Sequence, residues 1–334
     1  MTRRVTALAA LIGLCGAVGV VGFRWFARVP PPENQIEEVV RRAWTVGKRV
    51  PLAGDQEIRI PRQDLMTAHV ETSSSGSLRI EYTAGALKGL TVWEDADRTY
   101  RLNPATGRLT VAPHPSEGED AFRLIANCRF SWKGRDTVAG RSAWVVEVRP
   151  ESGVGSWRRL WIDPKTYVIL ANEARTEMGE LTHGVRFRSV KILQPGQEPG
   201  PEHYLPPTHL RAEPQPADEL QEKPLANPLR AAEQLGFQIR RPRWLPRGYA
   251  FNHAFEILCP CPVGHPAVRL EYTDGMNTLS ILECGHPGCK SVNNCFSDAS
   301  PGQLAIRAER EGYRYLLLGD LPRPAAERIV SSMQ

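Results

Sequence analysis

The chain has 334 residues, enough for about two domains of roughly 150 residues each. Hydrophobic residues make up 41% and charged residues 24% of the sequence, which excludes both wholesale disorder and a multi-spanning membrane protein. A net charge of +5 would suit a nucleic-acid partner, but four arginines precede the first acidic residue, Glu33. Without them the net charge is +1, and no basic patch indicates nucleic-acid binding. The four are Arg3, Arg4, Arg24 and Arg28.

Residues 5–23 form a run of 19 residues without a charge. As a helix this run would span about 28 Å, enough to cross a membrane. A cleaved signal peptide usually has a shorter apolar run of about 7–15 residues and a small-residue cleavage site. We therefore expect residues 1–29 to anchor the chain in the inner membrane, with a cleaved signal peptide as the alternative. Either way, the rest of the chain is exported.

The segment after the anchor predicts a helix followed by a sheet. Apolar residues at helical spacing form one stripe before Gly47, a natural helix stop. From about residue 56 to 193 apolar and polar residues alternate, with turn residues between the runs and a helix around 119–127. Residues 30–193 are thus predicted as an α+β domain, a curved antiparallel sheet wrapped on helices. The stripe consists of Ile36, Val39, Val40, Ala43 and Trp44.

Two further segments follow. Residues 194–227 contain eight prolines and few large apolar residues, a composition that predicts a linker. Residues 228–334 predict a small α+β domain with strands at about 267–272, 277–282, 304–309 and 313–318. A first helix is predicted from 228 to 235, before Gly236, and a closing helix from 322 to 333.

Four blocks between residues 124 and 191 carry a family resemblance. The blocks read N-C-R-F at 127–130, G-R-D-T-V-A-G-R-S-A-W-V-V-E-V-R-P at 134–150, S-W-R-R-L-W-I-D-P-K-T at 156–166 and A-N-E-A-R-T-E-M-G-E-L at 171–181. They resemble the N-terminal domain of the RseB/MucB family, exported regulators of the envelope-stress sigma factor. That family is grouped with the lipoprotein carriers LolA and LolB. The W-L-P-R-G-Y turn at 244–249 and the G-D-L-P run at 319–322 are similar to the family's small C-terminal domain.

The resemblance implies an open half-barrel with helices on its concave side, over residues 33–193. It also implies a lipid or lipoprotein ligand and a membrane anti-sigma protein as partner. The chain departs from the family at two places. Tyr167 stands where members commonly have glycine, and the C-terminal block has a cysteine cluster that the family does not suggest.

An apolar half-barrel could hold acyl chains by burying their surface, at about 25 cal/mol per Å². The alternative is that the same residues only pack against the predicted helix. Trp93 and Trp161 alternate to the other face, where they would suit a protein or membrane contact unless loops cover them. The candidate lining residues are Leu78, Ile80, Tyr82, Leu90, Val92, Tyr100, Leu102, Val146, Val148, Leu160 and Ile162.

The C-terminal block holds five cysteines within 37 residues, and His286 lies among them. Disulfides are the default in an exported chain, although the odd number leaves one thiol over. A Zn²⁺ or Cu(I) site is the second interpretation, because thiolates and imidazole suit both ions. A redox-active pair in the C-P-C segment is the third. The residues are Cys259, Cys261, Cys284, Cys289, Cys295 and His286.

No nucleophile elbow, phosphate loop or H-E-x-x-H motif is present in the sequence, so we expect no enzyme and no catalytic residues. Asp163 is expected to cap a turn. Three hypotheses remain for the function. The first is an anchored, envelope-sensing regulator that binds a lipid-like ligand. The second is a lipid or lipoprotein carrier, and the third a metal or redox module built on the cysteines.

Overall fold

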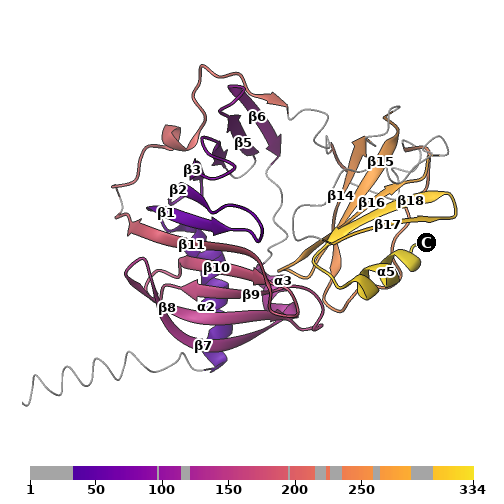
Figure 1. Ribbon diagram of the computed structural model, residues 1–334, viewed down its shortest axis with the longest axis horizontal. Coiled ribbons are helices and arrows are strands. Elements are labelled where there is room, and N and C mark those ends of the chain that lie inside the picture. The colour runs from indigo at the N-terminus through magenta and orange to yellow at the C-terminus, as the bar shows by residue number, and fades with distance from the viewer. Residues whose placement is uncertain are drawn as a thin grey trace, which may run out of the picture.

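The computed structural model contains two β-sheets and the helices that cover them (Figure 1). The anchor predicted at residues 5–23 lies outside the described part of the chain. Within the described part, no helix is both long and apolar enough to cross a membrane. The structure describes residues 33–95, 98–113, 121–194, 196–214, 223–225, 235–258, 264–286 and 304–334.

The first helix of the described chain, α2, covers Glu33–Thr45, as the apolar spacing predicts. All five residues of the predicted stripe are buried. The 3-10 turn that follows, η1 (Gly47–Arg49), lies in close contact with the backbone of Tyr167. A Cβ on Gly47 would lie 2.3 Å from the carbonyl oxygen of Tyr167, so no larger residue fits where the helix ends.

The first sheet has twelve strands in the order β12-β6-β5-β4-β3-β2-β1-β11-β10-β9-β8-β7. All neighbours are antiparallel except β12, which pairs parallel with β6. The strands are β1 (Leu52–Arg59), β2 (Met66–Thr72), β3 (Leu78–Ala84), β4 (Thr91–Glu94), β5 (Arg98–Asn103), β6 (Arg108–Pro113), β7 (Cys128–Val138), β8 (Arg141–Pro150), β9 (Trp157–Ile162), β10 (Ile169–Arg175), β11 (Leu181–Ile192) and β12 (Glu213–Pro214).

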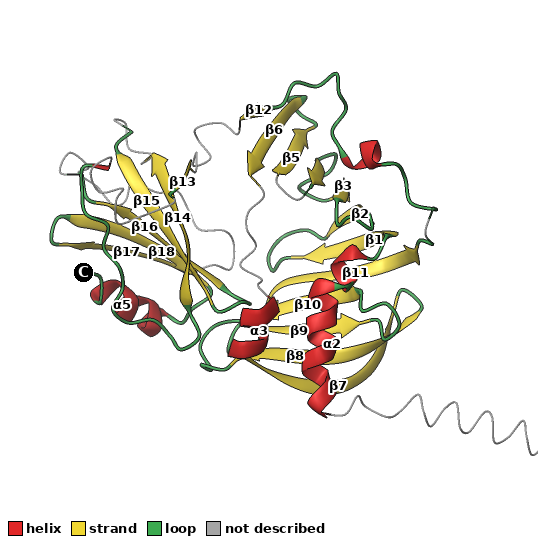
Figure 2. Cartoon of the chain, turned by 180° about the vertical axis from the view of Figure 1, so that it is seen from behind, coloured by secondary structure: helices red, strands yellow, loops and turns green. Residues whose placement is uncertain are grey.

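The chain builds this sheet in two halves that meet in the middle. Strands β1 to β6 run outward in sequence order, and the chain then continues through α3 (Ala121–Asn127) to β7 at the opposite edge. Strands β7 to β11 lead back, and β11 pairs with β1, with Leu52 opposite Ile192. Helices α2 and α3 lie across β7–β10, whereas β1–β6 extend beyond them (Figure 2).

Alternate residues of β8 and β9 point to opposite faces of the sheet, as the period of two requires. Val146 and Leu160 face α2 and are fully buried there. Val145 and Trp161 face the other way and belong to a second buried cluster. This half of the sheet therefore has a buried apolar cluster on each face.

The second sheet has six antiparallel strands in the order β13-β14-β15-β16-β18-β17. The sequence predicted four of these strands, β15 to β18, but not β14. The helix expected at 228–235 lies outside the described residues except for Leu235, which is helical. The strands are β13 (Lys223–Pro224), β14 (Ala250–Leu258), β15 (Pro266–Thr273), β16 (Thr278–Cys284), β17 (Leu304–Arg310) and β18 (Tyr313–Gly319).

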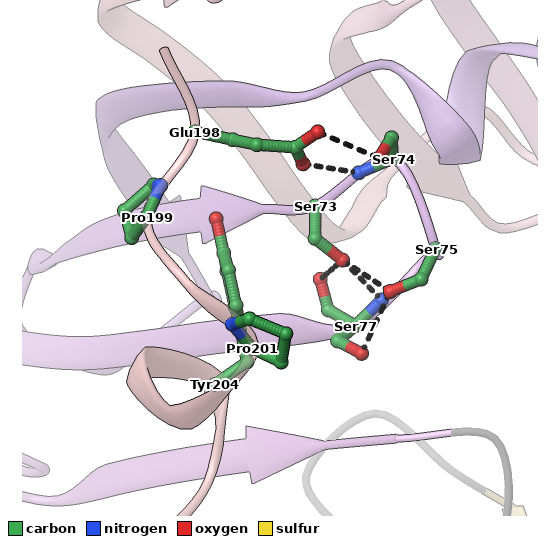
Figure 3. A pocket seen from close by; sticks show the side chains of 8 residues that line it. All are labelled: Ser73, Ser74, Ser75, Ser77, Glu198, Pro199, Pro201 and Tyr204. Carbon is green, nitrogen blue, oxygen red and sulfur yellow. Dashed lines mark hydrogen bonds between the residues drawn. The ribbon is translucent and has the colours of Figure 1, made fainter. Parts of the chain in front are cut away.

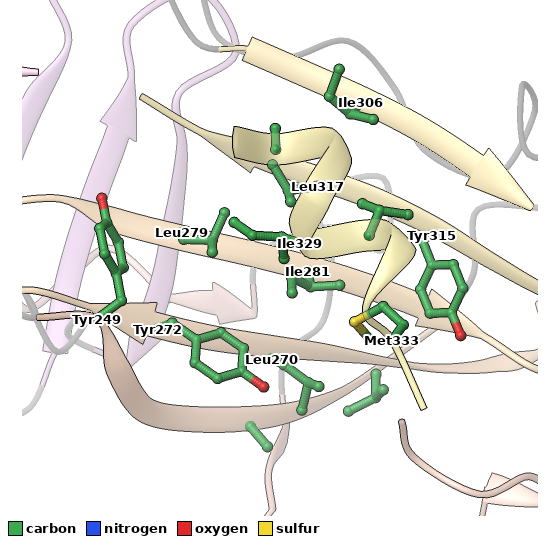
Figure 4. Packing of buried hydrophobic residues seen from close by; sticks show 14 of the residues in the cluster. Tyr249, Leu270, Tyr272, Leu279, Ile281, Ile306, Tyr315, Leu317, Ile329 and Met333 are labelled. Atoms are coloured by element: carbon green, nitrogen blue, oxygen red, sulfur yellow. The ribbon is translucent and has the colours of Figure 1, made fainter. Parts of the chain in front are cut away.

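Helix α5 (Arg323–Ser331) covers one face of this sheet. Figure 4 shows Ile329 of the helix over Leu279 and Ile281 of β16. The two sheets with few helices confirm the α+β class predicted from the sequence.

The described parts of the proline-rich segment lie against both sheets. Its 3-10 helix η2 (Pro201–Tyr204) contacts the first sheet, since the Tyr204 hydroxyl donates to the Thr72 carbonyl oxygen at 3.2 Å. Strand β12 extends the same sheet, and β13 pairs with β14 of the second.

Candidate functional site

A hollow of about 820 Å³ lies where α2 ends, between that end of the helix and the first residue of α3. Its volume falls in the range of about 300–1,000 Å³ typical of small-molecule sites. Trp44 and Ala121 supply apolar walls, and both also belong to or pack against the buried cluster under α2. Two exposed cations, Lys48 and Arg49, line the same hollow. The complete lining is Trp44, Thr45, Val46, Lys48, Arg49, Val50, Pro51 and Ala121.

Helix α2 covers four of the predicted lining residues, so they are not open to a ligand. Val146, Val148, Leu160 and Ile162 are each 0% exposed and pack with the α2 stripe. These four residues therefore pack against the helix, which was the alternative to lining a ligand site.

A second group lies on the same face, beyond the helices. The register links the two groups, because Leu160 stands opposite Asn172, Asn172 opposite Val185, and Val185 opposite Ile58. The row continues to β3 and β4, where Ile80 lies opposite Val92. Leu78, Ile80, Tyr82 and Leu90 are half-buried, and Val92 is buried.

Two predicted lining residues lie on the wrong face. In the β4–β5 pair, Val92 stands opposite Arg101, and Trp93 stands opposite Tyr100. Directly opposed residues share a face, so Tyr100 and Leu102 point away from Ile80 and Val92. The prediction that they line the same apolar surface is wrong, because alternation within one strand does not tell which face joins its neighbour's.

The two tryptophans expected on the outer face are both covered. Trp93 and Trp161 are 5% and 7% exposed. The indole nitrogen of Trp161 donates to a carboxylate oxygen of Asp136 at 2.9 Å. Neither ring offers a surface for a partner.

A turn of the second sheet also reaches this site, which the sequence did not suggest. Met276, between β15 and β16, is 3% exposed and belongs to the same buried cluster as Val146 and the α2 stripe. The local sequence gives one signal: the turn-forming D-G-M-N run at 274–277 contains an apolar residue, Met276, where turns are usually polar.

Of the cysteine cluster, only Cys284 lies within the described residues. Cys284 is fully buried at the end of β16, with its sulfur 3.9 Å from the Pro266 carbonyl oxygen. The ring of His286 stacks on that of His265, with centroids 3.8 Å apart. Among the described residues, no three His, Cys, Asp or Glu side chains gather closely enough to hold a metal ion. Cys259, Cys261, Cys289 and Cys295 lie outside these residues.

Cys128, from the N-C-R-F block, is a buried unpaired thiol at the start of β7. Burial raises its pKa to about 12, so the thiolate needed for nucleophilic or metal chemistry is disfavoured.

A smaller pocket of about 270 Å³ lies where the proline-rich segment meets the β2–β3 turn (Figure 3). The Glu198 carboxylate accepts hydrogen bonds from the backbone N–H and the hydroxyl of Ser74, at 2.8 and 2.7 Å. Nearby, His203 is 2.7 Å from Glu71. The polar groups here bind one another, so this pocket serves to attach the segment to the sheet.

The two sheets together define an open half-barrel followed by a small helix-covered sheet. No family model matches the sequence, and no curated protein is similar to it in sequence. Solved structures of MucB share the fold. A structure of the Pseudomonas aeruginosa MucA/MucB complex matches with a TM-score of 0.66 and 18% identity, over 90% of this chain and 98% of that one.

MucB in complex with MucA(peri) matches with a TM-score of 0.62 and 17% identity, over 91% of this chain and 98% of that one. MucB alone gives a TM-score of 0.54 and 16% identity, over 91% and 99%. The chain therefore has the fold of MucB across both sheets, and the fold implied by the RseB/MucB resemblance is confirmed.

Proposed function

We propose that this protein is an exported, membrane-anchored regulator of the envelope-stress type. In this role it binds a single-chain anionic amphiphile in the half-barrel and a membrane-bound partner of the anti-sigma class. The MucB fold over about nine-tenths of the chain supports the regulatory role, since MucB has been solved in complex with MucA. The residue 5–23 run supports the anchor and an extracytoplasmic location.

The observation that carries the ligand proposal is the hollow at the end of α2. Its Trp44 and Ala121 walls favour an acyl chain through area burial, which is non-directional and gives little selectivity. Lys48 and Arg49 add an attraction for a negative headgroup. An amphiphile with one acyl chain and an anionic head matches both features.

A titration with palmitate tests this proposal. The protein's tryptophan fluorescence, to which Trp44 contributes from the wall of the hollow, reports binding. Replacing both Lys48 and Arg49 by glutamate should weaken palmitate binding by about tenfold, equivalent to about 1.4 kcal/mol. Arg307→Glu, an exposed reversal on the second sheet, should leave the affinity unchanged. Equal affinities for all three chains would place the headgroup elsewhere, and no binding by any would refute the ligand proposal.

A carrier of the LolA type is the second candidate, because the same hollow could hold an acyl chain in transit. A freely moving carrier requires release from the membrane, so mass analysis of the mature N-terminus separates the two roles. Retention of residues 5–23 favours the regulator, and their cleavage favours the carrier. In both roles the protein binds and does not catalyse.

The cysteine cluster supports a third candidate, a metal or redox module. Metal analysis and thiol counting on the purified chain test it directly. Bound Zn²⁺ or Cu(I) at one equivalent would favour it, and a metal-free chain with four of the five cysteines oxidised would favour structural disulfides.

A further inference from the structure

The turn between β15 and β16 places Met276 in the buried apolar cluster between the first sheet and its helices. Gly275 makes this approach possible. A Cβ at Gly275 would lie 2.3 Å from the backbone nitrogen of Leu124 in α3, so the turn and the helix touch backbone to backbone. Met276 then packs with Leu124, Cys128 and the fully buried residues of β8 and β9.

Three hydrogen bonds hold the turn against the first sheet. The Asn127 side-chain amide donates to the Asp274 carbonyl oxygen at 3.1 Å. The Arg158 guanidinium donates to the Met276 carbonyl oxygen at 3.0 Å, and the Asn277 amide donates to the Ser156 carbonyl oxygen at 3.1 Å. The three partners lie in α3, in β9 and in the loop before β9, so the turn of the second sheet is docked on the first domain.

The turn also has internal hydrogen bonds that do not involve the first sheet. One carboxylate oxygen of Asp274 accepts hydrogen bonds from the backbone N–H groups of Met276 at 2.8 Å and Asn277 at 2.6 Å. The second sheet therefore presents Met276 on a rigid support, and the turn can leave the first sheet as a unit without unfolding.

Met276 does not line the hollow, but the hollow and Met276 are connected through one buried cluster. Trp44 lines the hollow and is part of the buried cluster that Met276 completes, and Ala121 packs against it. An acyl chain that extends inward from the hollow must displace something in this cluster. Helix α2 contributes five buried side chains to the cluster, and α3 and the turn contribute one each. Of these three elements only the turn belongs to the second sheet, so it can leave while the first sheet stays folded.

We propose that Met276 is a built-in competitor for the acyl chain, so that ligand binding and docking of the β15–β16 turn exclude each other. This inference rests on the proposed lipid ligand and adds its regulation. A ligand in the first sheet then releases the second sheet, and the altered position of the second sheet reports that the ligand is present.

The affinity of the full chain for palmitate tests the competition. If the turn occupies the site, Met276→Ala raises the competent fraction and tightens palmitate binding, by about fivefold or more. Met333→Ala, a fully buried methionine in the core of the second sheet, is the matched control and should leave the affinity unchanged. Weaker binding by Met276→Ala would make Met276 part of the ligand site and overturn the proposal.

Maleimide labelling of Cys128 gives a readout without the ligand. Cys128 lies in the same cluster as Met276, and peptide mass spectrometry resolves it from the other cysteines. Labelling should be several-fold faster in Met276→Ala than in the parent chain or Met333→Ala, and palmitate should accelerate it in the parent. Palmitate binding with parent-like labelling in every case would overturn this proposal alone. No palmitate binding by any chain would overturn the proposed function and this proposal with it.

Discussion

Gly275 lies so close to α3 that a Cβ at this position would be 2.3 Å from the backbone nitrogen of Leu124. Gly275 also has a φ of +96°, which other residues rarely adopt. Gly275→Ala should therefore separate the turn from the helix, and each sheet should keep its own fold. Small-angle X-ray scattering should report a larger radius of gyration, while circular dichroism stays unchanged.

Gly312 is the matched control for that substitution. It has a φ of +79°, and a Cβ there would meet nothing within 4 Å. Gly312→Ala should cost about 1–2 kcal/mol of backbone strain and leave the radius of gyration as in the parent chain. An unchanged radius in Gly275→Ala would show that the contact with Leu124 does not hold the sheets together.

Val146 is fully buried between β8 and α2. Val146→Asp should prevent folding of the first sheet, because it places a charge in this apolar cluster without a partner. Val146→Ala should fold and lose about 2 kcal/mol of unfolding free energy, through lost burial and the cavity left behind. Urea unfolding followed by tryptophan fluorescence measures both, and an aspartate variant of parental stability would contradict the assignment of this face.

Burial raises the pKa of Glu283 from its ordinary value of 4.5 to about 8. Both carboxylate oxygens accept from the Arg240 backbone N–H, which favours the charged form, but burial prevails. The folded chain thus binds the proton more tightly than the unfolded chain. Protonation of Glu283 therefore stabilises the folded chain fully below about pH 4.5, and this stabilisation is lost as the pH rises to about 8.

The unfolding free energy should therefore fall by up to about 1.4 kcal/mol per pH unit in this window. Glu283→Gln should abolish the slope and be more stable than the parent at pH 8. Glu309→Gln, at an exposed position of β17, controls for the lost charge. Urea unfolding at pH 5, 6, 7 and 8 measures this, and a parental slope in Glu283→Gln would contradict the role of Glu283.

Glu198 fastens the proline-rich segment to the β2–β3 turn through Ser74. Glu198→Ala should release it, and amide hydrogen exchange in residues 198–204 should become several-fold faster. Glu202→Ala, at an exposed position of the same segment, should leave exchange as in the parent. Equal exchange in both variants would show that the Ser74 contact does not fasten the segment.

Local patterns were enough to predict several features. The helical spacing of Ile36 to Trp44 gave α2, and the alternation in β8 and β9 gave the face of Val146 and Leu160. Asp163 caps a turn as expected, because its carboxylate accepts from the backbone N–H of Lys165 at 2.7 Å. In each case the determining residues lie within a few positions of one another.

Long-range relationships were not predictable in the same way. The face of Tyr100 depends on how β5 pairs with β4, and the place of Met276 depends on a contact between residues about 150 apart in the chain. Tyr167 is instructive, since it has a φ of +61° at a position where the RseB/MucB family commonly has glycine. Its hydroxyl accepts a hydrogen bond from Arg42 at 3.2 Å, a compensation visible only in three dimensions.

Native mass spectrometry tests the central claim, a lipid-like ligand in the half-barrel, most directly. The chain from residue 30 onward is sprayed as purified and again after incubation with palmitate. We expect one amphiphile per chain, either retained through purification or bound on addition, and a smaller bound fraction when Lys48 and Arg49 are both replaced by glutamate. A chain that carries no lipid and binds none when it is supplied would contradict the account.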